Sequence, residues 1–204
     1  MIKLYGYDTI NTLKVLIFLF ESGIDYEFEP INIRIGEQHT AEFLAINPAG
    51  KIPVIWDGDE YQAESNSILF SLAHKTGWGL ADNPSLQTKL ISWLFYQASN
   101  QGPYFGQIEY WSKKAKVPNP EALAQYRAIA NRTIVDLNNN LRDKQYICGD
   151  VYSIADIAFF PWFRAHKHLG LSIEKAEHLS QWLDRILARL ATQKALAVYN
   201  QISS

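Results

Sequence analysis

A proline-bearing extended segment followed by a tight turn constrains the fold of this chain most. Residues 51–56 read Lys-Ile-Pro-Val-Ile-Trp, and residues 57–59, Asp-Gly-Asp, form a hairpin-type turn into a short partner strand at residues 60–63. Pro53 cannot donate to a sheet ladder, so it should lie where the strand begins and its backbone faces no neighbouring strand. The segment therefore predicts a β-hairpin with a free edge.

The free edge and the helix after it predict a binding site. If the Ile52–Pro53 bond is cis, the N–H and C=O groups of Ile52 can pair with an extended peptide ligand. Glu64 and Ser65 begin an apolar-periodic segment at residues 64–76, and the free N–H groups of a helix N-terminus bind carboxylates. Taken singly, Pro53 and Ser65 are typical of a strand-edge proline and a helix cap, whereas the two together belong to a recognisable sequence pattern that is described below.

The order of the predicted elements before residue 77 is βαβαββα, which is typical of a thioredoxin-like mixed sheet with helices on both faces. Hydrophobic periodicity of two or of three to four residues locates each element. The predicted strands are residues 2–5, 26–31, 51–56 and 60–63, and the predicted helices are residues 11–23, 40–46 and 64–76.

A composition break then separates this region from a purely helical one. Residues 77–84 contain two glycines, Asp82, Asn83 and a proline, which is typical of a linker. We predict an α/β domain at residues 1–78, a linker at 79–86 and an all-α bundle at 87–204. Its predicted helices begin at residue 86, with a kink at Gly102-Pro103, and cover residues 121–142, 157–169 and 179–190.

One motif in the helical region favours a structural role. Residues 153–156, Ser-Ile-Ala-Asp, fit a capping box in which Ser153 is the N-cap and Asp156 reaches back to its backbone. We interpret Asp156 as structural rather than catalytic.

Composition and charge exclude several classes of function. The chain has 204 residues and a net charge of −2, without the basic stripe typical of nucleic-acid binding. Its most apolar early run, residues 15–20, is too short for a membrane span, and no signal peptide is evident, so we expect a cytoplasmic protein. Cys148 is the single cysteine, which excludes an internal disulfide, a Cys-x-x-Cys pair and a thiolate metal site, and no metal is expected.

Residues 47–54, Asn-Pro-Ala-Gly-Lys-Ile-Pro-Val, and residues 64–69, Glu-Ser-Asn-Ser-Ile-Leu, resemble the glutathione-binding segments of the cytosolic glutathione transferases. The resemblance covers nearly the whole chain and implies the fold predicted above. The loop at residues 8–11, together with residues 93–95 and 102–107, is most similar to the bacterial Nu class, which is related to the yeast nitrogen-regulatory prion protein. Membership would imply that glutathione is a co-substrate.

Glutathione activation requires donors to its thiol, which is only a few per cent ionised at pH 7 when its pKa is about 8.5. The loop before the first helix offers candidates. In serine-type classes the hydroxyl lies six residues before the valine of the first helix, which selects Thr9, whereas a tyrosine-type site would use Tyr7. The Nu resemblance implies Thr9 and Asn11 as donors. The proline that is usual beside this threonine is absent, since Asp8 precedes Thr9 and Ile10 follows it. Asp8 would either raise the thiol pKa or cap the helix.

The same resemblance implies roles for residues elsewhere in the chain. Gln38 and Lys51 would contact the glycine end of glutathione, Ile52 and Pro53 its cysteine backbone, and Glu64 and Ser65 its γ-glutamyl group. Arg132 would reach glutathione across the interface of a homodimer. The second-substrate pocket would contain Tyr7, Tyr104 and Trp162.

We therefore expect an enzyme that uses the glutathione thiolate to reduce disulfide bonds, and that also conjugates it or reduces peroxides. The partner would be a small electrophile or disulfide. Because Cys148 stands alone in the sequence, both sulfurs of a disulfide exchange would have to come from glutathione. The alternative is a binding or regulatory protein on the same fold, since a fold does not imply a function.

Overall fold

The computed structural model describes residues 1–81 and 83–202, which form two compact units. The first unit contains residues 1–78 and the C-terminal stretch from Leu187, and the second contains Gly79–Ile186. Asp82, which belongs to the predicted linker, lies outside the described residues.

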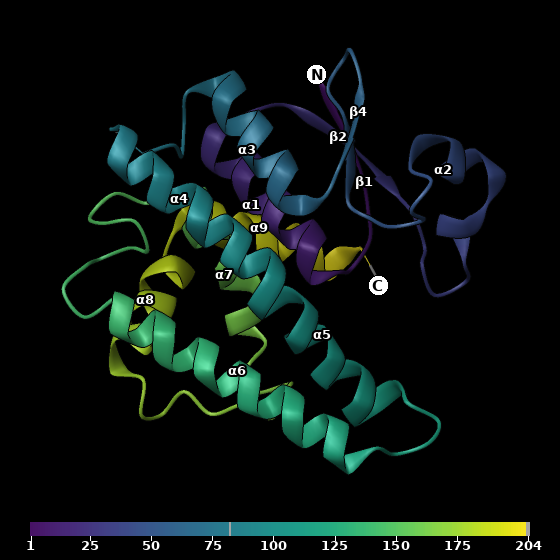
Figure 1. The fold of residues 1–204 in the computed structure, drawn as a ribbon. Coiled ribbons are helices and arrows are strands. Elements are labelled where there is room, and N and C mark those ends of the chain that lie inside the picture. Colours follow the sequence, from purple (N-terminus) through teal and green to yellow (C-terminus); the bar gives the residue numbers. More distant parts are fainter. Residues whose placement is uncertain (82, 203–204) are drawn as a thin grey trace. The chain divides into compact units, whose positions relative to one another are not determined.

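The first unit is built on a four-stranded mixed sheet in the order β2-β1-β3-β4 (Figure 1). Strand β1 is parallel to β2 and antiparallel to β3, and β3 is antiparallel to β4. The predicted βαβαββα order and the thioredoxin-like fold are confirmed. The elements are β1 (Ile2–Gly6), α1 (Ile10–Ser22), β2 (Tyr26–Pro30), the 3-10 turn η1 (Glu37–His39), α2 (Ala41–Ile46), β3 (Val54–Trp56), β4 (Tyr61–Ala63) and α3 (Ser65–Thr76).

Two boundaries in this unit follow from local backbone chemistry. Strand β3 begins at Val54 rather than at residue 51 as predicted, because Pro53 has no N–H to give to the ladder. Helix α1 ends as predicted at Gly23, whose φ of 70° lies in the left-handed region that glycine adopts without strain.

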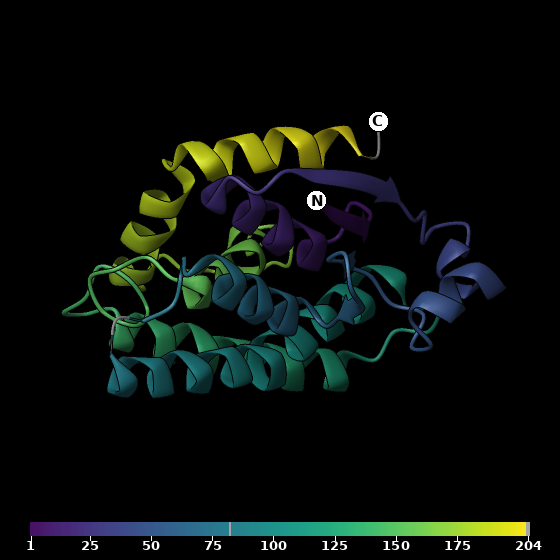
Figure 2. The same ribbon diagram turned by 90° about the horizontal axis from the view of Figure 1, so that it is seen from above.

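The C-terminal helix α9 (Leu190–Gln201) packs along α1 in the first unit, as Figure 2 shows. Arg189 binds Glu21 through two hydrogen bonds of 2.5 and 2.8 Å. The hydroxyl of Tyr199 donates to the backbone carbonyl of Asp8 at 3.0 Å. The sequence placed residues 187–204 in the helical domain, but these contacts group them with the sheet, because pairing partners far apart in sequence leave no local signal.

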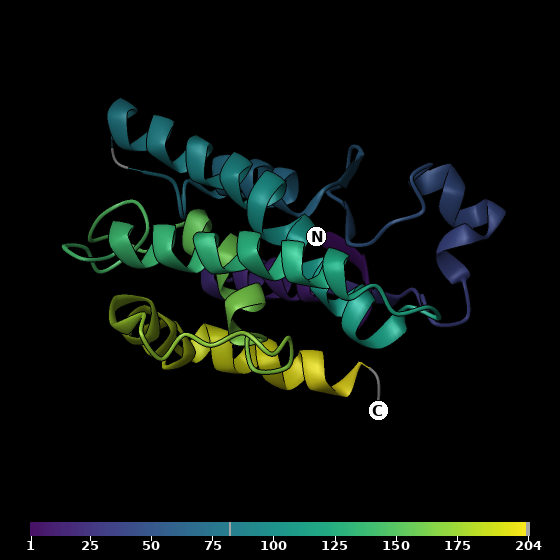
Figure 3. The same cartoon turned by 60° about the horizontal axis from the view of Figure 1, so that its bottom comes forward.

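The second unit is helical. Its elements are α4 (Pro84–Tyr96), the π-helical stretch η2 (Gln97–Gln101), α5 (Gly102–Glu109), a second π-helical stretch η3 (Tyr110–Lys114), α6 (Pro120–Asn140), α7 (Ile154–Arg164) and α8 (Glu177–Leu187). The helix widens into a π turn directly before Pro103, where the missing N–H removes one backbone bond. Helices α5 and α6 lie side by side (Figure 3).

Asp156 lies at the centre of the second unit and is fully buried. Its carboxylate accepts hydrogen bonds from the backbone N–H of Ser153 at 3.0 Å, the backbone N–H of Ile147 at 2.9 Å and the indole N–H of Trp182 at 2.8 Å. The predicted capping box is confirmed, and the same carboxylate also holds α8 and the 147 loop against α7. Among the described helices, none has both the length and the apolar character that crossing a membrane demands.

Candidate functional site

The register of the sheet brings three chain segments to one edge. Tyr5 pairs with Val54, and Val54 pairs with Ala63. Because β1 and β4 both run antiparallel to β3, the end of β1, the start of β3 and the end of β4 are neighbours. The loop after β1, the Ile52-Pro53 segment and the N-terminus of α3 therefore lie together.

The Ile52–Pro53 segment has the free edge that the sequence predicts. The bond is cis, Pro53 is buried, and the ladder starts at the next residue. Within the described residues, neither the N–H nor the C=O of Ile52 makes a backbone hydrogen bond. Both groups can accept an extended ligand as an added strand.

The N-terminus of α3 has no side-chain cap. The N-caps of α1, α2, α4 and α6 all bind a first-turn N–H through a side chain, whereas Glu64, the N-cap of α3, does not. Glu64 also has a φ of 65° and a ψ of 110°, a strained conformation for a residue with a Cβ. The N-terminus of α3, which has no side-chain cap, is therefore suited to an external anion.

A buried lysine lies behind this helix end. Lys14 of α1 is 1% exposed, and its Nζ donates to Ser65 Oγ at 3.2 Å and to Asn66 Oδ1 at 3.3 Å. Burial lowers the pKa of Lys14 to about 7, and the charge of Glu64 opposes this shift. Sequence reasoning missed Lys14, although a lone cation within the apolar run at residues 13–19 was a visible signal.

The loop after β1 ends in a hydroxyl cap. Thr9 is the N-cap of α1, and its Oγ1 accepts from the N–H of Thr12 at 3.3 Å and lies 2.8 Å from Thr12 Oγ1. Thr12 Oγ1 in turn accepts from the N–H of Tyr7 at 3.4 Å. Asn11 is half-buried in the first turn of α1. The alternative expectation, that Asp8 caps the helix, is wrong, since Thr9 occupies that position.

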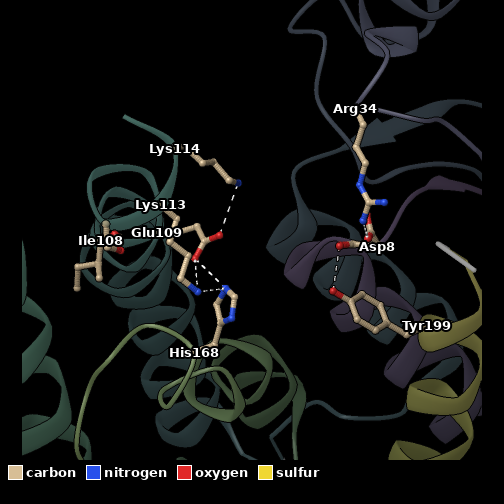
Figure 4. Close-up of polar contacts among 9 residues, drawn as sticks. Asp8, Arg34, Ile108, Glu109, Lys113, Lys114, His168 and Tyr199 are labelled. Atoms are coloured by element: carbon tan, nitrogen blue, oxygen red, sulfur yellow. Dashed lines mark hydrogen bonds and ion pairs between the residues drawn. The ribbon is translucent and has the colours of Figure 1, made fainter. Parts of the chain in front are cut away.

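Asp8 is held in a different way, which Figure 4 shows. Its carboxylate forms an ion pair with Arg34, and the guanidinium of Arg34 lies 5.5 Å from the centre of the Tyr7 ring. On the other side, Tyr199 donates to the Asp8 carbonyl. Asp8 is therefore held by contacts on two sides, and its negative charge is paired with the positive charge of Arg34.

The η1 turn that carries Gln38 lies close to Gly50, the residue before Lys51. A Cβ at Gly50 would lie 2.9 Å from His39 Nδ1 and 3.1 Å from the Gln38 carbonyl oxygen, so a side chain there would push η1 away. The side chain of Asn47 donates to the Lys51 carbonyl at 2.8 Å and fixes the turn. In the described chain, the buried Oε1 atom of Gln38 has no hydrogen-bond partner, and Lys51 is exposed.

The remaining predicted residues lie in the second unit. Arg132 is exposed on α6, and the Tyr104 ring of α5 lies 5.9 Å from the ring of Tyr126. The indole nitrogen of Trp162 is buried without a hydrogen-bond partner among the described residues. The role of Arg132 and a pocket that combines Tyr7 with Tyr104 and Trp162 stay predictions.

The second unit contains two further ionisable groups, the Glu109 carboxylate with its cationic neighbours and the Cys148 thiol. The Glu109 carboxylate lies 3.0 Å from Nε2 of His168 and 3.8 Å from the ammonium groups of both Lys113 and Lys114 (Figure 4). Cys148 is buried, and burial raises the pKa of its thiol to about 12. Groups of three or more metal-ligating side chains do not occur in residues 1–81 and 83–202.

Comparison with known proteins places this geometry among glutathione-binding folds. Residues 1–74 match the family model "Glutathione S-transferase, N-terminal domain", and residues 100–189 match "Glutathione S-transferase, C-terminal domain". The disulfide-bond oxidoreductase YfcG of Escherichia coli is 35% identical over 203 residues, which cover 96% of this chain and 94% of that protein.

Solved structures give the same picture. A glutathione transferase family member from Pseudomonas fluorescens, with two glutathione molecules bound, has a TM-score of 0.87 and 35% identity over 96% of this chain and 92% of that one. The glutathione transferase URE2P6 from Phanerochaete chrysosporium, in complex with oxidized glutathione, has a TM-score of 0.92 and 29% identity over 98% and 97% of the two chains.

Proposed function

The chain belongs to the glutathione S-transferase family, and on that basis we propose that it activates the thiol of glutathione and uses it to reduce disulfide bonds. The observation that carries the proposal is the shared sheet edge, where an unpaired extended segment, an uncapped helix N-terminus and a hydroxyl loop meet. The names of the E. coli relative and of the glutathione-bound structures support this choice.

We assign the parts of glutathione by their chemistry. The cysteinyl backbone pairs with the N–H and C=O of Ile52 beside Pro53. The γ-glutamyl carboxylate binds Ser65 and the N-terminus of α3, and its ammonium binds Glu64. The glycine carboxylate binds the exposed Lys51, and Gln38 contacts the same end of glutathione.

The thiol is activated by a chain of hydroxyl groups. The hydroxyl oxygen of Thr12 accepts from the N–H of Tyr7. If the Thr12 hydroxyl donates its proton to Thr9, then Thr9 Oγ1 accepts two hydrogen bonds from Thr12, one from its hydroxyl and one from its backbone N–H, and both of its lone pairs are used. The proton of Thr9 is then available to the glutathione sulfur, with Asn11 as a second donor. Donors to the thiolate lower its pKa, and each unit corresponds to about 1.4 kcal/mol.

Disulfide exchange needs two thiols. The first glutathione thiolate attacks one sulfur of the substrate disulfide, forms a mixed disulfide and releases the other half, which takes up a proton. A second glutathione thiolate then attacks the glutathione sulfur of the mixed disulfide, which yields glutathione disulfide and the second substrate thiol. Cys148 supplies neither sulfur, because it is buried and its thiol is protonated at neutral pH.

We also propose a homodimer in which Arg132 reaches glutathione of the partner subunit, and a second-substrate pocket formed with Tyr104 and Trp162. We place the enzyme in the cytoplasm, where glutathione keeps thiols reduced. The same thiolate would also serve conjugation and peroxide reduction, so an activity panel should compare a small disulfide, an aryl halide and an organic hydroperoxide.

Calorimetric titration with glutathione separates this proposal from a protein that only carries the fold. We expect binding at millimolar or lower ligand, and turnover of 2-hydroxyethyl disulfide in an assay coupled to glutathione reductase. Absence of binding at millimolar glutathione would contradict the proposal, and binding without turnover of any panel substrate would favour the regulatory alternative.

A further inference from the structure

We propose that Lys14 is a positioning residue for glutathione, holding the Ser65 hydroxyl in the orientation that donates to the γ-glutamyl carboxylate. The inference rests on the proposed function, and it adds a residue that lies one layer behind the ligand. The evidence is the juxtaposition of a fully buried cation with the first turn of α3.

The donors and acceptors of Lys14 and Ser65 determine where the hydroxyl proton of Ser65 points. In its protonated form the Lys14 ammonium has three donors and no acceptor, so the 3.2 Å contact then uses a lone pair of Ser65 Oγ. A hydroxyl has one proton, which then points away from Lys14 toward another acceptor. The bond from Lys14 to Asn66 Oδ1, at 3.3 Å, places the ammonium under two successive residues of the helix end.

Charge complementarity identifies the group that this end of the site accepts. The buried ammonium of Lys14 adds positive charge beneath the N-terminus of α3, whose dipole also favours an anion. Glu64, at the same helix end but exposed, offers a negative charge. A γ-glutamyl group carries one carboxylate and one ammonium, so its two charges match this pair.

Burial makes a charged lysine costly at this position. The neighbours of Lys14 along α1 are buried apolar side chains, and a buried cation loses its hydration. An apolar side chain of similar length would pack in the same space without that cost. A charged group kept where it destabilises the fold is typical of a functional position.

A double-mutant cycle tests the proposal by calorimetric titration with glutathione. The variants are Lys14→Met, Ser65→Ala, the combination of both, and Lys194→Met as a control on the exposed face of α9. We expect each of the first two to raise the Kd about tenfold, the size of one charge-assisted hydrogen bond. The combination should raise it no further than Ser65→Ala alone, and the control should match the wild type.

Kinetics add a readout that a purely structural role would not move. Lys14→Met should raise KM for glutathione, while kcat at saturation and the pH at which bound thiol ionises stay at wild-type values. Lys14→Arg should recover most of the affinity, and Lys14→Gln should not. If the Met variant does not fold, the Arg and Gln variants provide the test. Equal Kd values for glutathione in these two variants would overturn the proposal.

Each outcome separates this inference from the proposed function. If the wild-type protein does not bind glutathione, the proposed function fails. If wild type binds and Ser65→Ala weakens binding, but Lys14→Met binds like the wild type, only the role of Lys14 is overturned. Additive losses in the double variant would also overturn it, because Lys14 would then act independently of Ser65.

Discussion

The Oγ1 atoms of Thr9 and Thr12 lie 2.8 Å apart, and the same Thr9 oxygen accepts the N–H of Thr12. Thr9 is therefore the cap of α1 as well as the proposed donor to the glutathione sulfur. The two roles can be separated, because a cap contributes to the free energy of unfolding and a donor sets the pKa of the bound thiol.

Replacement of Thr9 by alanine should affect both quantities. Loss of the cap should lower the free energy of unfolding by about 1 kcal/mol. Loss of the donor should raise the pKa of bound glutathione, measured from the ultraviolet absorbance of the thiolate across pH. Thr9→Ser keeps the hydroxyl and should resemble the wild type. If Tyr7→Phe abolishes activity while Thr9→Ala leaves it intact, the tyrosine-type assignment replaces this one.

The Asp8–Arg34 ion pair should tune the same thiol. Arg34→Gln leaves the Asp8 carboxylate without its counter-charge and should raise the pKa of bound glutathione, whereas Asp8→Asn should lower it. Each change should stay below about one unit, since Arg34 is exposed to solvent. The double variant should return to the wild-type pKa, and Arg164→Gln, on the helical unit, serves as the control. Shifts of the same sign in both single variants would contradict the electrostatic account.

The stability of the Lys14→Met variant should depend on pH in a defined direction. The pKa of Lys14 is about 7 in the folded protein and 10.5 in its reference state. Between these values the unfolded chain binds more protons, so the wild type gains stability as pH rises. Lys14→Met should therefore be more stable than wild type at pH 6, by on the order of a few kcal/mol, with the advantage shrinking toward pH 9.

Chemical denaturation of both proteins at several pH values provides the measurement, with Lys194→Met as the matched exposed control. A Met variant that is less stable than the wild type at pH 6, by the same margin as at pH 9, would show that Lys14 contributes packing or hydrogen bonds rather than a buried charge.

Removal of the Asp156 carboxylate should destabilise the helical unit strongly. Asp156→Ala leaves four buried donors without this acceptor, namely the backbone N–H groups of Ser153 and Ile147, the hydroxyl of Ser153 and the indole N–H of Trp182. We expect a loss of roughly 3 kcal/mol or more, measured by urea denaturation. Asp184→Ala, at an exposed position on α8, should change the free energy of unfolding by less than about 0.5 kcal/mol.

Local patterns in the sequence predicted the parts of the fold whose determinants lie close together. The hairpin, the strand-edge position of Pro53, the end of α1 at Gly23 and the Ser153 capping box all depend on a few adjacent residues. Glu64 and Ser65 were placed at a helix start for the same reason. The sheet register then brings these segments together, because β1, β3 and β4 pair in one order.

Long-range pairing explains what the sequence did not predict. The grouping of α9 with the first unit depends on Arg189 finding Glu21, and the position of Asp8 depends on Arg34. The contact between Lys14 and Ser65 likewise forms only when α1 packs under the N-terminus of α3. Composition and periodicity carry no information on such partners.

The central claim is that disulfide reduction takes both of its sulfurs from glutathione. The rate of 2-hydroxyethyl disulfide reduction at saturating glutathione, compared between wild type and Cys148→Ser, tests it most directly. The account predicts equal kcat and KM in the two proteins, because Cys148 is buried and its thiol pKa is about 12. Loss of reductase activity in a Cys148→Ser protein that keeps its fold and its affinity for glutathione would show that a protein thiol takes part, and would contradict the mechanism.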